Sequence, residues 1–496
     1  MGGDAGDERS TAAKATEGIF GLRSRRVVVE RKQKLEVVPA TLWIDGDRIL
    51  GVQRDDGTLD RKGVAGPEAA PVEDLGDRLL TPAFVNAHSH LALVFARGFD
   101  PGPAVRGNRV EELFFRLESA LQPGDVLAFA TVGAYESVLA GVGTVWDHYY
   151  AGSEVAAAMA RVGLAGVVAP TLQDLAGPGA EDFQDSLQET MDIHEDEELR
   201  RLGVRAALGP HATDTVSDVA WRELARLAES ESLLVHAHLA QSPEEVERAQ
   251  ARWGRDPLAG LAQLGVLDRI PRGVWAHAIY LSRRSLTRLP PDHTLVACPR
   301  AQSHFGLPAR VDAWAEAGVR WSVASDAAAG NDTMDPRGEL PLIAAMRSLP
   351  ASWSAAAERM LEGHGRSDEL AAATWRGRDL QWSNFEALVE PASLLRRVWS
   401  IPGGIDPSHP TGNFAAGARA DVLVWELEHP NAWPATDPLQ FLVHGNAAPC
   451  VWRMMSGGRW RSEGGAHLRS IVESDAWRAA SREAKRRLEL LRERCH

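Results

Sequence analysis

Short apolar runs alternate with amphipathic stretches through the middle of the chain. The stretches 110–121, 151–162 and 221–228 repeat apolar residues every three or four positions, which predicts helices. The apolar runs lie at 143–146, 163–169, 204–208, 233–238, 273–277, 294–298 and 319–326, and an eighth ends at His90. Strands that alternate with helices are typical of a parallel sheet, and eight such strands predict a (β/α)8 TIM barrel.

The two ends of the chain show strand and turn signals instead. Strand-like runs occur at 26–29, 40–44 and 49–52, and again at 420–425 and 450–455. We expect the two ends to pair into one β-sandwich that flanks the barrel. The predicted domains are a disordered tail (1–17), a first sandwich part (18–80), the barrel (81–405), a second sandwich part (406–462) and a C-terminal helical extension (463–496), whose charged helix at 474–496 lies on the surface.

A buried strand that ends in His-x-His is the first candidate for chemistry. The run from Thr81 to Leu91 is apolar until its carboxyl end, where His88 and His90 stand two residues apart. Side chains two residues apart point to the same side of a strand, so two ligands of one metal are placed together. A buried histidine is often only a hydrogen-bonded core residue. Two histidines at this spacing, followed by further polar residues later in the chain, favour a metal site over that core role.

Polar residues follow the other predicted strands in turn. These residues are Asp147, His148, Gln173, Asp174, His211, His236, His238, His277 and Asp326. Because the carboxyl ends of parallel strands meet at one face of a barrel, we expect a single pocket there. Neutral imidazoles and a carboxylate suit Zn²⁺ or another first-row divalent ion, whose bound water supplies hydroxide near neutral pH. Asp326 would contact the metal and accept the water's proton, and His277 would polarise the electrophile or hold the hydroxide.

Composition narrows the classes of function. A formal net charge of −14 argues against a nucleic acid or an anionic membrane as partner and favours a small-molecule substrate. The three cysteines, Cys298, Cys450 and Cys495, are too few and too scattered for a disulfide framework, which fits a reducing cytoplasm. No stretch is apolar over a membrane-spanning length.

Lysine is absent between Lys62 and Lys485, so arginine carries nearly all of the basic charge. Any mechanism that needs a central lysine is therefore excluded. The excluded mechanisms are Schiff-base chemistry and a carboxylated lysine that bridges two metal ions.

The chain resembles the amidohydrolase superfamily and, within it, the deaminase and chlorohydrolase branch. That branch includes methylthioadenosine/S-adenosylhomocysteine deaminases, guanine deaminase and triazine hydrolases. The resemblance extends from about residue 19 to residue 458. It depends on the segments Thr81–His90, Gly141–Asp147, Gly209–His211, His238–Gln241, Ala276–His277, Cys298–Pro299, Ala324–Asp326 and Gly417–Val424.

The resemblance implies a metal site and its ligands. The implied ligands are His88, His90, His238 and Asp326, with His277 as the catalytic imidazole beside them and His211 as a substrate contact. The missing central lysine fits members that hold one divalent metal, which is expected to be Zn²⁺, with Fe²⁺ and Mn²⁺ as alternatives. A homodimer is expected because many relatives associate.

One position departs from the deaminase pattern. In the deaminases a proton-shuttling Glu stands three residues after the third His ligand, whereas this chain has Gln241. An amide hydrogen-bonds a ring but cannot shuttle a proton. Glu244 and Glu245 lie just beyond, at a predicted helix start, and are expected to face solvent. We interpret His236 and His148 as residues that support the ligands.

Two amide side chains lie in segments that differ from the family pattern. Gln302 occupies the place of an Asn one methylene shorter, and Asn331 is kept after Asp326 although the residues between differ. Both are predicted to bind substrate, and the changes around them favour a different substrate rather than a decayed site.

Three hypotheses follow. The first is a metal-dependent hydrolase that cleaves a C–N bond of a small amino-heterocycle, with Gln241 in contact with the ring. The second keeps the metal and the water but removes chloride or opens a cyclic amide, because those leaving groups need less protonation than ammonia. The third is a metal-retaining ligand-binding protein without turnover. The retained ligands and His277 argue against the third, since an inert scaffold does not need them.

Overall fold

The centre of the molecule is a curled sheet of parallel strands. The computed structural model describes residues 18–59, 63–98, 108–302, 307–346 and 389–495, so the predicted disordered tail lies outside the described residues. The strands are β6 (Phe84–Ser89), β7 (Val142–Tyr149), β8 (Ala165–Leu172), β9 (Val204–Ala206), β10 (Gly209–Pro210), β11 (Val235–Leu239), β12 (Gly273–His277), β13 (Thr294–Ala297) and β14 (Arg320–Val323). They follow one another around the sheet in sequence order, as the alternating pattern predicts.

Two isolated bridges join the segments of this sheet. Leu208 pairs with Val235 in parallel, which connects the β9–β10 strand pair to β11. Ser89 pairs with Asp326, which brings the end of β6 beside the turn that follows β14. The first and last strands of the curl therefore lie side by side. The polar residues that follow them in the sequence meet at this seam.

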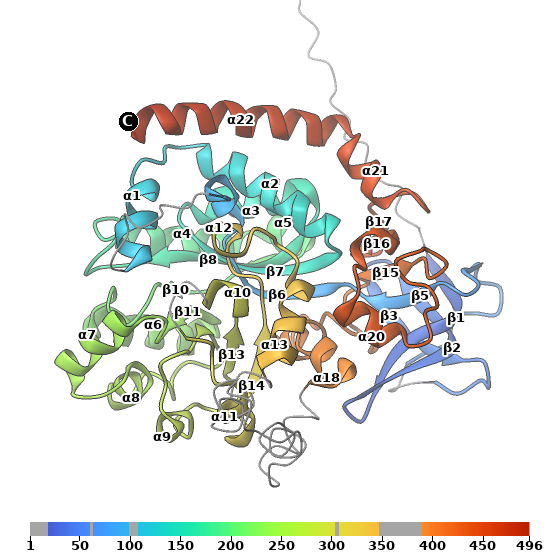
Figure 1. Ribbon diagram of the computed structural model, residues 1–496, viewed down its shortest axis with the longest axis horizontal. Coiled ribbons are helices and arrows are strands. Elements are labelled where there is room, and N and C mark those ends of the chain that lie inside the picture. The colour runs from blue at the N-terminus through green and yellow to red at the C-terminus, as the bar shows by residue number, and fades with distance from the viewer. Residues whose placement is uncertain (1–17, 60–62, 99–107, 303–306, 347–388, 496) are drawn as a thin grey trace, which may run out of the picture.

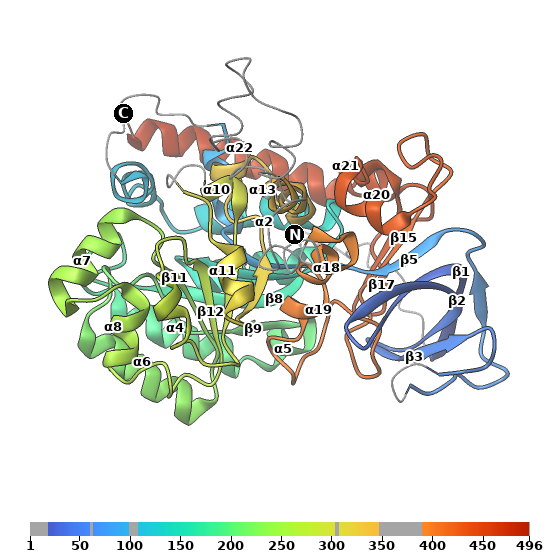
Figure 2. The same ribbon diagram turned by 60° about the horizontal axis from the view of Figure 1, so that its bottom comes forward.

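Helices cover the outside of the curl, as Figures 1 and 2 show from two directions. The longer ones are α2 (Asp125–Leu139), α3 (Gly152–Val162), α4 (Phe183–Glu195), α6 (Asp218–Glu231), α7 (Pro243–Trp253) and α8 (Pro257–Gln263). The shorter ones are η1 (Leu91–Ala96), η3 (Val110–Phe114), α1 (Phe115–Glu118), α5 (Glu197–Leu202), α9 (Arg283–Leu286), α10 (Pro299–Gln302), α11 (Val311–Glu316), α12 (Ala328–Asn331), η4 (Pro336–Glu339), α13 (Leu340–Met346), α18 (Pro391–Arg396), α19 (Ser400–Gly403), α20 (Pro438–His444) and η5 (Ala448–Cys450). In the part of the chain that is described, no helix combines the length and apolarity needed to cross a bilayer.

Side-chain caps fix where several helices begin. The Ser217 hydroxyl accepts a hydrogen bond from the Ala220 N–H at the start of α6. Ser242 does the same for the Glu245 N–H at α7, and the Asp256 carboxylate for the Ala259 N–H at α8. Each cap satisfies a backbone donor that lacks an intrahelical partner. The loops between the strands and these helices are thereby held in defined positions at the edge of the curl.

Both faces of the curled sheet are buried, which explains why its strands read as continuous apolar runs. Every residue of β7 and of β8 is buried. A separate core cluster combines residues of these strands with residues from the segments that follow them. Its members are Val85, Ala87, Trp146, Val167, Ala169, Ala207, Val274, Val296, Cys298, Ala301, Ala324 and Ile405.

A second, mixed sheet flanks the curl and combines strands from the N-terminal and C-terminal parts of the described chain. Its strands are β1 (Ile19–Arg31), β2 (Lys34–Asp45), β3 (Arg48–Arg54), β4 (Val72–Asp74), β5 (Leu79–Pro82), β15 (Val422–Trp425), β16 (Val451–Ser456) and β17 (Arg459–Trp460). The antiparallel pairing of β15 with β5 joins the two ends, as predicted. The division of this sheet into the two layers of a sandwich, and the domain boundaries, stay predictions.

Two strand ends differ from the sequence expectation for the same physical reason. The strand predicted at 163–169 begins at Ala165, because Gly163 adopts a left-handed conformation (φ 77°) at the end of α3. The strand predicted at 319–326 ends at Val323, and Asp326 follows with φ 62°. A left-handed residue cannot continue a strand, so the chain turns at these points.

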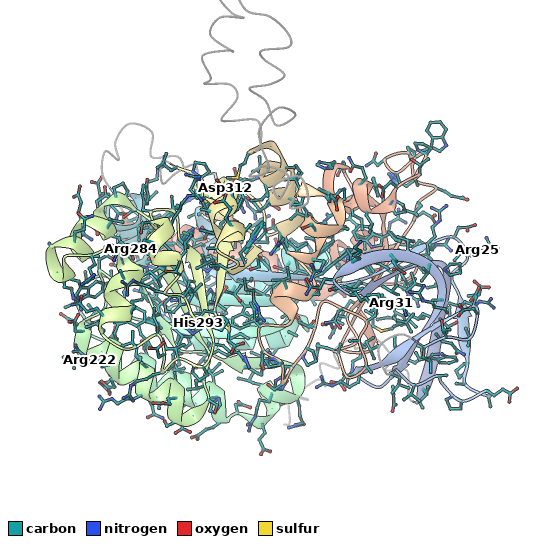
Figure 3. All side chains as sticks on the ribbon, turned by 90° about the horizontal axis from the view of Figure 1, so that it is seen from below. Arg25, Arg31, Arg222, Arg284, His293 and Asp312 are labelled. Carbon is teal, nitrogen blue, oxygen red and sulfur yellow. The ribbon has the colours of Figure 1, made fainter. Side chains whose placement is uncertain are left out.

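Arginines dominate the basic surface. In Figure 3 the side chains of Arg25, Arg222 and Arg284 lie on the outside of the molecule, on the flanking sheet and on the helical cover. Because lysine is nearly absent from the sequence, ion pairs across the surface are made by guanidinium groups.

The C-terminal helix α22 (Asp475–Cys495) lies along α2, away from the flanking sheet's outer strands (Figure 1). It follows α21 (His467–Val472) and buries Ala484 and Leu491 while most of its side chains are exposed, in agreement with a charged surface helix. Its contact with α2 includes the fully buried carboxylate of Asp125. That carboxylate pairs with Arg487 at 3.2 Å and with Arg494.

We expect an Asp125→Ala substitution to loosen this contact. Two arginines lose their partner, but both are partly exposed and regain water, so the expected cost is about 1–3 kcal/mol of unfolding free energy. Urea unfolding and amide hydrogen exchange measure the cost and its location. Exchange should accelerate in α22, whereas Glu489→Ala, which removes an exposed carboxylate from the same helix, should change neither. Unchanged exchange in α22 would contradict the proposed anchor.

Candidate active site

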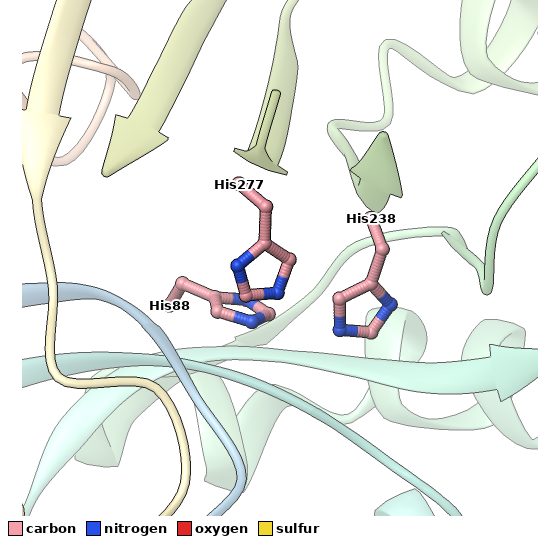
Figure 4. A group of neighbouring side chains, drawn as sticks. All are labelled: His88, His238 and His277. Carbon is pink, nitrogen blue, oxygen red and sulfur yellow. The ribbon is translucent and has the colours of Figure 1, made fainter. Parts of the chain in front are cut away.

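Four histidines and one aspartate converge where the ends of the curled sheet meet. His88 lies on β6 next to its last residue, and His90 directly follows the strand. His238 lies on β11, His277 ends β12, and Asp326 follows β14. Figure 4 shows the rings of His88, His238 and His277 turned toward one another from three separate strands. The structure therefore brings together the residues that the sequence predicts as metal ligands, with His277 beside them.

The two oxygens of Asp326 face different imidazoles. Oδ1 lies 3.7 Å from His88 Nε2 and 3.4 Å from His90 Nε2. Oδ2 lies 3.7 Å from His277 Nε2. His238 Nε2 lies 3.3 Å from His90 Nε2, so it belongs to the same cluster. One carboxylate oxygen thus faces two of the predicted ligands and the other faces the predicted catalytic imidazole.

Backbone carbonyls fix the orientation of two of these rings. His238 Nδ1 lies 2.9 Å from the carbonyl oxygen of His211, and His90 Nδ1 contacts the carbonyl oxygen of His148. A carbonyl only accepts, so each Nδ1 carries the proton and donates it. Each Nε2 is then an unprotonated nitrogen that faces the centre of the cluster, which is the form that binds a metal ion.

The donor set fits a divalent cation. His88 Nδ1 lies 2.8 Å from His236 Nε2, whereas His88 Nε2 is buried and has no hydrogen-bond partner within the described residues. A buried polar nitrogen without a partner is costly unless another ligand satisfies it. The ligand atoms of His88, His90 and Asp326 lie within 4.8 Å of one another, and those of the sets that contain His238 and His277 do as well. Three imidazoles and a carboxylate are a typical zinc donor set.

Burial keeps these imidazoles neutral. It lowers the pKa of His90 to about 3 and that of His238 to about 4. It also lowers the pKa of His88 well below the usual value of a histidine. Burial also raises the pKa of Asp326 to about 7, against a hydrogen bond that its Oδ1 accepts from the Ala327 N–H. Neutral imidazoles keep their lone pairs available for a cation.

Left-handed backbone conformations occur at the residues that carry the chemistry. His277 has φ 73° and Asp326 has φ 62°, and neither is a glycine. Such conformations cost on the order of 1–3 kcal/mol each and persist where the surroundings impose them. At both positions the strand has just ended, and the turn aims the side chain into the cluster.

A pocket opens over the cluster. His90, His238, His277 and Asp326 form its polar floor, and His211 and Gln241 also line it. Its walls are mostly aromatic and aliphatic. They include Leu93, Val110, Phe114, Phe115, Tyr149 and Tyr150. A mostly apolar pocket with a few convergent polar groups suits a flat ring that carries polar substituents.

Gln302 and Asn331 are hydrogen-bonded to the backbone beside the cluster. Gln302 Nε2 donates to the carbonyl of His277 at 3.4 Å, and its Oε1 accepts from the Ala309 N–H at 3.0 Å. Asn331 Nδ2 donates to the carbonyl of Ser325. Neither residue is among those that line the pocket. Both amides hold the turns that carry His277 and Asp326, and the substrate-binding roles predicted for them stay predictions.

The expectation that Glu245 faces solvent is wrong. The Glu245 carboxylate is buried, accepts a hydrogen bond from the Gln241 N–H at 2.8 Å and is also bonded to the Thr213 hydroxyl. It is the third residue of α7, where a side chain folds back over the helix start. Burial raises its pKa to about 7. Glu245 therefore fixes the backbone at Gln241, whereas Glu244 is half-buried.

The residues predicted to support the ligands do contact them. His236 is bonded to His88, and the His148 backbone carbonyl orients His90. Asp147, which precedes His148, is fully buried and contacts the Leu91 N–H. These contacts hold the His-x-His segment against the neighbouring strand.

Sequence patterns did not reveal the roof of the pocket. Phe114, Phe115 and Glu118 lie on η3 and α1, the helix predicted at 110–121, and they line the pocket together with Arg109. The local periodicity predicted a helix there. Nothing in it showed that this helix packs over the ends of distant strands.

Comparisons with known proteins identify the family of this chain. A sequence profile described as the amidohydrolase family matches residues 79–374, which is more than half of the chain. The chain belongs to the amidohydrolase family. It is thus a hydrolase of the class that acts on carbon–nitrogen bonds, and the predicted resemblance is confirmed.

Curated relatives match nearly the whole amidohydrolase chain. A 5'-deoxyadenosine deaminase of Methanothrix thermoacetophila is 29% identical over 420 residues, which cover 84% of this chain and 88% of the relative. A 5-methylthioadenosine/S-adenosylhomocysteine deaminase of Pyrococcus horikoshii is 29% identical over 425 residues, with 85% and 89% covered.

Solved structures share the fold of this amidohydrolase. An adenosine deaminase from Xanthomonas campestris with bound zinc superimposes with a TM-score of 0.75 at 19% identity, covering 97% of this chain and 100% of the other. A zinc complex of atrazine chlorohydrolase from Arthrobacter aurescens gives 0.70 at 19% identity, covering 93% and 99%. At this identity the likeness shows the fold.

Proposed function

We propose that this amidohydrolase is a metal-dependent deaminase that releases ammonia from an amino-substituted purine nucleoside or a related small heterocycle. The proposal takes the curled sheet as a (β/α)8 barrel with its active site at the carboxyl ends of the strands. The observation that carries it is the cluster of neutral imidazoles and one carboxylate at the floor of a mostly apolar pocket. The adenosine-type activities of the two curated relatives support the substrate class.

His88, His90, His238 and Asp326 would hold a single divalent cation, with zinc as the expected ion. Bound there, the cation would act as a Lewis acid and lower the pKa of a bound water to about 7. The carboxyl oxygens of Asp326 suit two tasks, because Oδ1 faces two of the ligands and Oδ2 faces His277. Oδ2 would accept the proton of the attacking water, and the His277 ring would hold that water in line with the substrate carbon.

The rest of the pocket would bind and orient the ring. His211 shares a hydrogen bond of 2.9 Å with the Thr215 hydroxyl through Nδ1, which leaves its Nε2 for a substrate. The Phe115 ring lies 5.6 Å from the His211 ring, centre to centre, and the two line the same pocket. Gln241, whose backbone is held by Glu245, would hydrogen-bond a ring nitrogen.

A second candidate reaction is the removal of chloride from a similar ring. Gln241 favours this reaction. An amide in place of the proton-shuttling carboxylate lowers the reaction rate most when the leaving group needs a proton. Chloride leaves without one. The pocket and the cation would serve both reactions equally.

Ammonia release from the zinc-loaded protein tests the proposal. We expect turnover with 5'-deoxyadenosine, methylthioadenosine or S-adenosylhomocysteine, detected by the change in purine absorbance and by free ammonia. The absence of turnover with all three, in protein that contains zinc and is folded, would contradict deamination of adenosine-type nucleosides. Chloride release from 6-chloropurine riboside under the same conditions would then favour the second reaction.

A further inference from the structure

The pocket contains a carboxyl group that the proposed metal site does not use. Among the described residues that line the pocket, the carboxyl groups are those of Asp326 and Glu118. Asp326 faces the histidine cluster. Glu118 ends α1, one of the helices that cover the pocket, and its side chain is partly exposed. A substrate in the pocket would therefore meet a carboxyl group besides that of Asp326.

Two tyrosines stand beside Glu118 at this wall. The hydroxyl groups of Tyr149 and Tyr150 both lie close enough to the Glu118 carboxyl to affect its pKa or to be affected by it. The Tyr150 hydroxyl donates a hydrogen bond to Gln173 Oε1 at 3.1 Å, and its ring lies 5.4 Å from that of Tyr149. The Tyr149 ring lies 6.2 Å from the ring of His90, one of the predicted metal ligands. This wall thus connects Glu118 with the polar floor of the pocket.

The other carboxyl near Gln241 cannot take the same part. Glu245 is spatially close to Gln241, but it is buried behind it, and both of its oxygens are engaged by the Gln241 N–H and the Thr213 hydroxyl. It does not line the pocket. Among the residues that the structure describes, Glu118 is therefore the carboxyl that a substrate would contact apart from Asp326.

We propose that Glu118 is a catalytic acid of this enzyme, which donates a proton to the departing amino nitrogen in place of the carboxylate absent at position 241. This inference rests on the deaminase function proposed above. Burial raises the pKa of Glu118 to about 8, and the Tyr149 interaction only partly opposes this effect. The carboxyl is then mostly protonated at neutral pH, as a proton donor must be.

The protons balance over one turnover. Water adds to the carbon that bears the amino group, so a C–O bond forms, the C=N electron pair moves to the ring nitrogen, and that nitrogen gains one proton of the water. The C–N bond to the amino group then breaks with its electron pair on nitrogen. Glu118 gives its proton to this nitrogen, and ammonia leaves. The remaining hydroxyl proton of the adduct passes to the Asp326 carboxylate as the product carbonyl forms. Asp326 then loses this proton to solvent water, and solvent water protonates Glu118 again.

A pair of substrates that differ in leaving group tests this role. The zinc-loaded wild type and a Glu118→Gln variant are compared with adenosine-type substrates, which lose ammonia, and with 6-chloropurine riboside, which loses chloride and needs no proton. We expect kcat for ammonia release to fall about 10²–10⁴-fold in the variant, because one acid/base group is lost. Chloride release should stay close to that of the wild type, since the amide keeps the size of the side chain.

Controls separate this role from structural effects. Glu112→Gln removes an exposed carboxylate from the same helical segment and should leave both reactions unchanged. Metal content and melting temperature are measured for each variant, and Glu118→Asp, which restores an acid, should recover part of the ammonia-releasing rate.

The outcomes are distinct. An equal loss with both leaving groups, or a raised KM with an unchanged kcat, would overturn the catalytic role of Glu118 and leave the deaminase function standing. A zinc-containing wild type that releases ammonia from none of the substrates would overturn the deaminase function, and the role of Glu118 with it.

Discussion

An Asp326→Asn variant is expected to lose turnover by about 10²–10⁴-fold or more, because the amide can no longer accept a proton from water. The amide also loses the negative charge that a cation would meet beside His88 and His90. The fall should appear in kcat for every substrate, whatever its leaving group. Steady-state kinetics on the zinc-loaded variant measures it.

The matched control for this variant is Asp292→Asn, which removes an exposed carboxylate from the loop before β13. It should retain the activity of the wild type. An Asp326→Asn variant that keeps more than about a tenth of the wild-type kcat would fall outside the loss expected for a general base. That result would remove Asp326 from the mechanism.

His238→Ala is expected to abolish the stabilisation that zinc gives to the protein. A ligand that binds only the folded state raises stability by about 2.7 kcal/mol at a hundred times its dissociation constant. Mutation of residues that only hydrogen-bond to a metal ligand already lowers metal affinity by about 10–100-fold. The loss of a direct ligand should lower the affinity for zinc by at least that much. The melting temperature of the wild type should rise with zinc, and that of the variant should not.

His194→Ala provides the comparison, since this histidine lies on α4, away from the cluster. Its melting temperature should rise with zinc as in the wild type. An equal rise in His238→Ala would show that zinc binds elsewhere, and it would contradict the assignment of His238 as a ligand.

Much of the fold was predictable because the signals are local. A strand buried on both faces must be apolar along its length, and β7 and β8 show that pattern directly. The place of His88 and His90 also followed from local geometry. Two residues separated by one position at the end of a strand share a side, and both Nε2 atoms do face Asp326 Oδ1.

The parts that escaped prediction depend on contacts between distant segments. Glu118 belongs to a helix whose periodicity is ordinary, and only the packing of that helix over the strand ends places the carboxyl in the pocket. Glu245 was expected in solvent because it starts a helix, yet it folds back onto the Gln241 N–H. Gln302 was identified by its place in the family pattern, whereas the direction of its amide depends on the backbone at His277.

The structure offers an explanation for Gln241, which stands where the deaminases have a proton-shuttling Glu. Gln241 lines the pocket and its backbone is held by Glu245, so its amide would contact a bound ring. In the mechanism that we propose, Glu118 would supply the acid that ammonia needs. This division of tasks accounts for a chain that keeps the predicted metal ligands and His277 while it lacks the usual shuttle.

Elemental analysis of the wild type purified without chelator shows whether the chain holds a metal ion. We expect about one equivalent of zinc, iron or manganese per chain, which is removed by a chelator and restored by added metal together with activity. Protein that is folded, contains no metal and cannot be loaded with any of the three ions would contradict this expectation. That result would favour a ligand-binding protein without turnover.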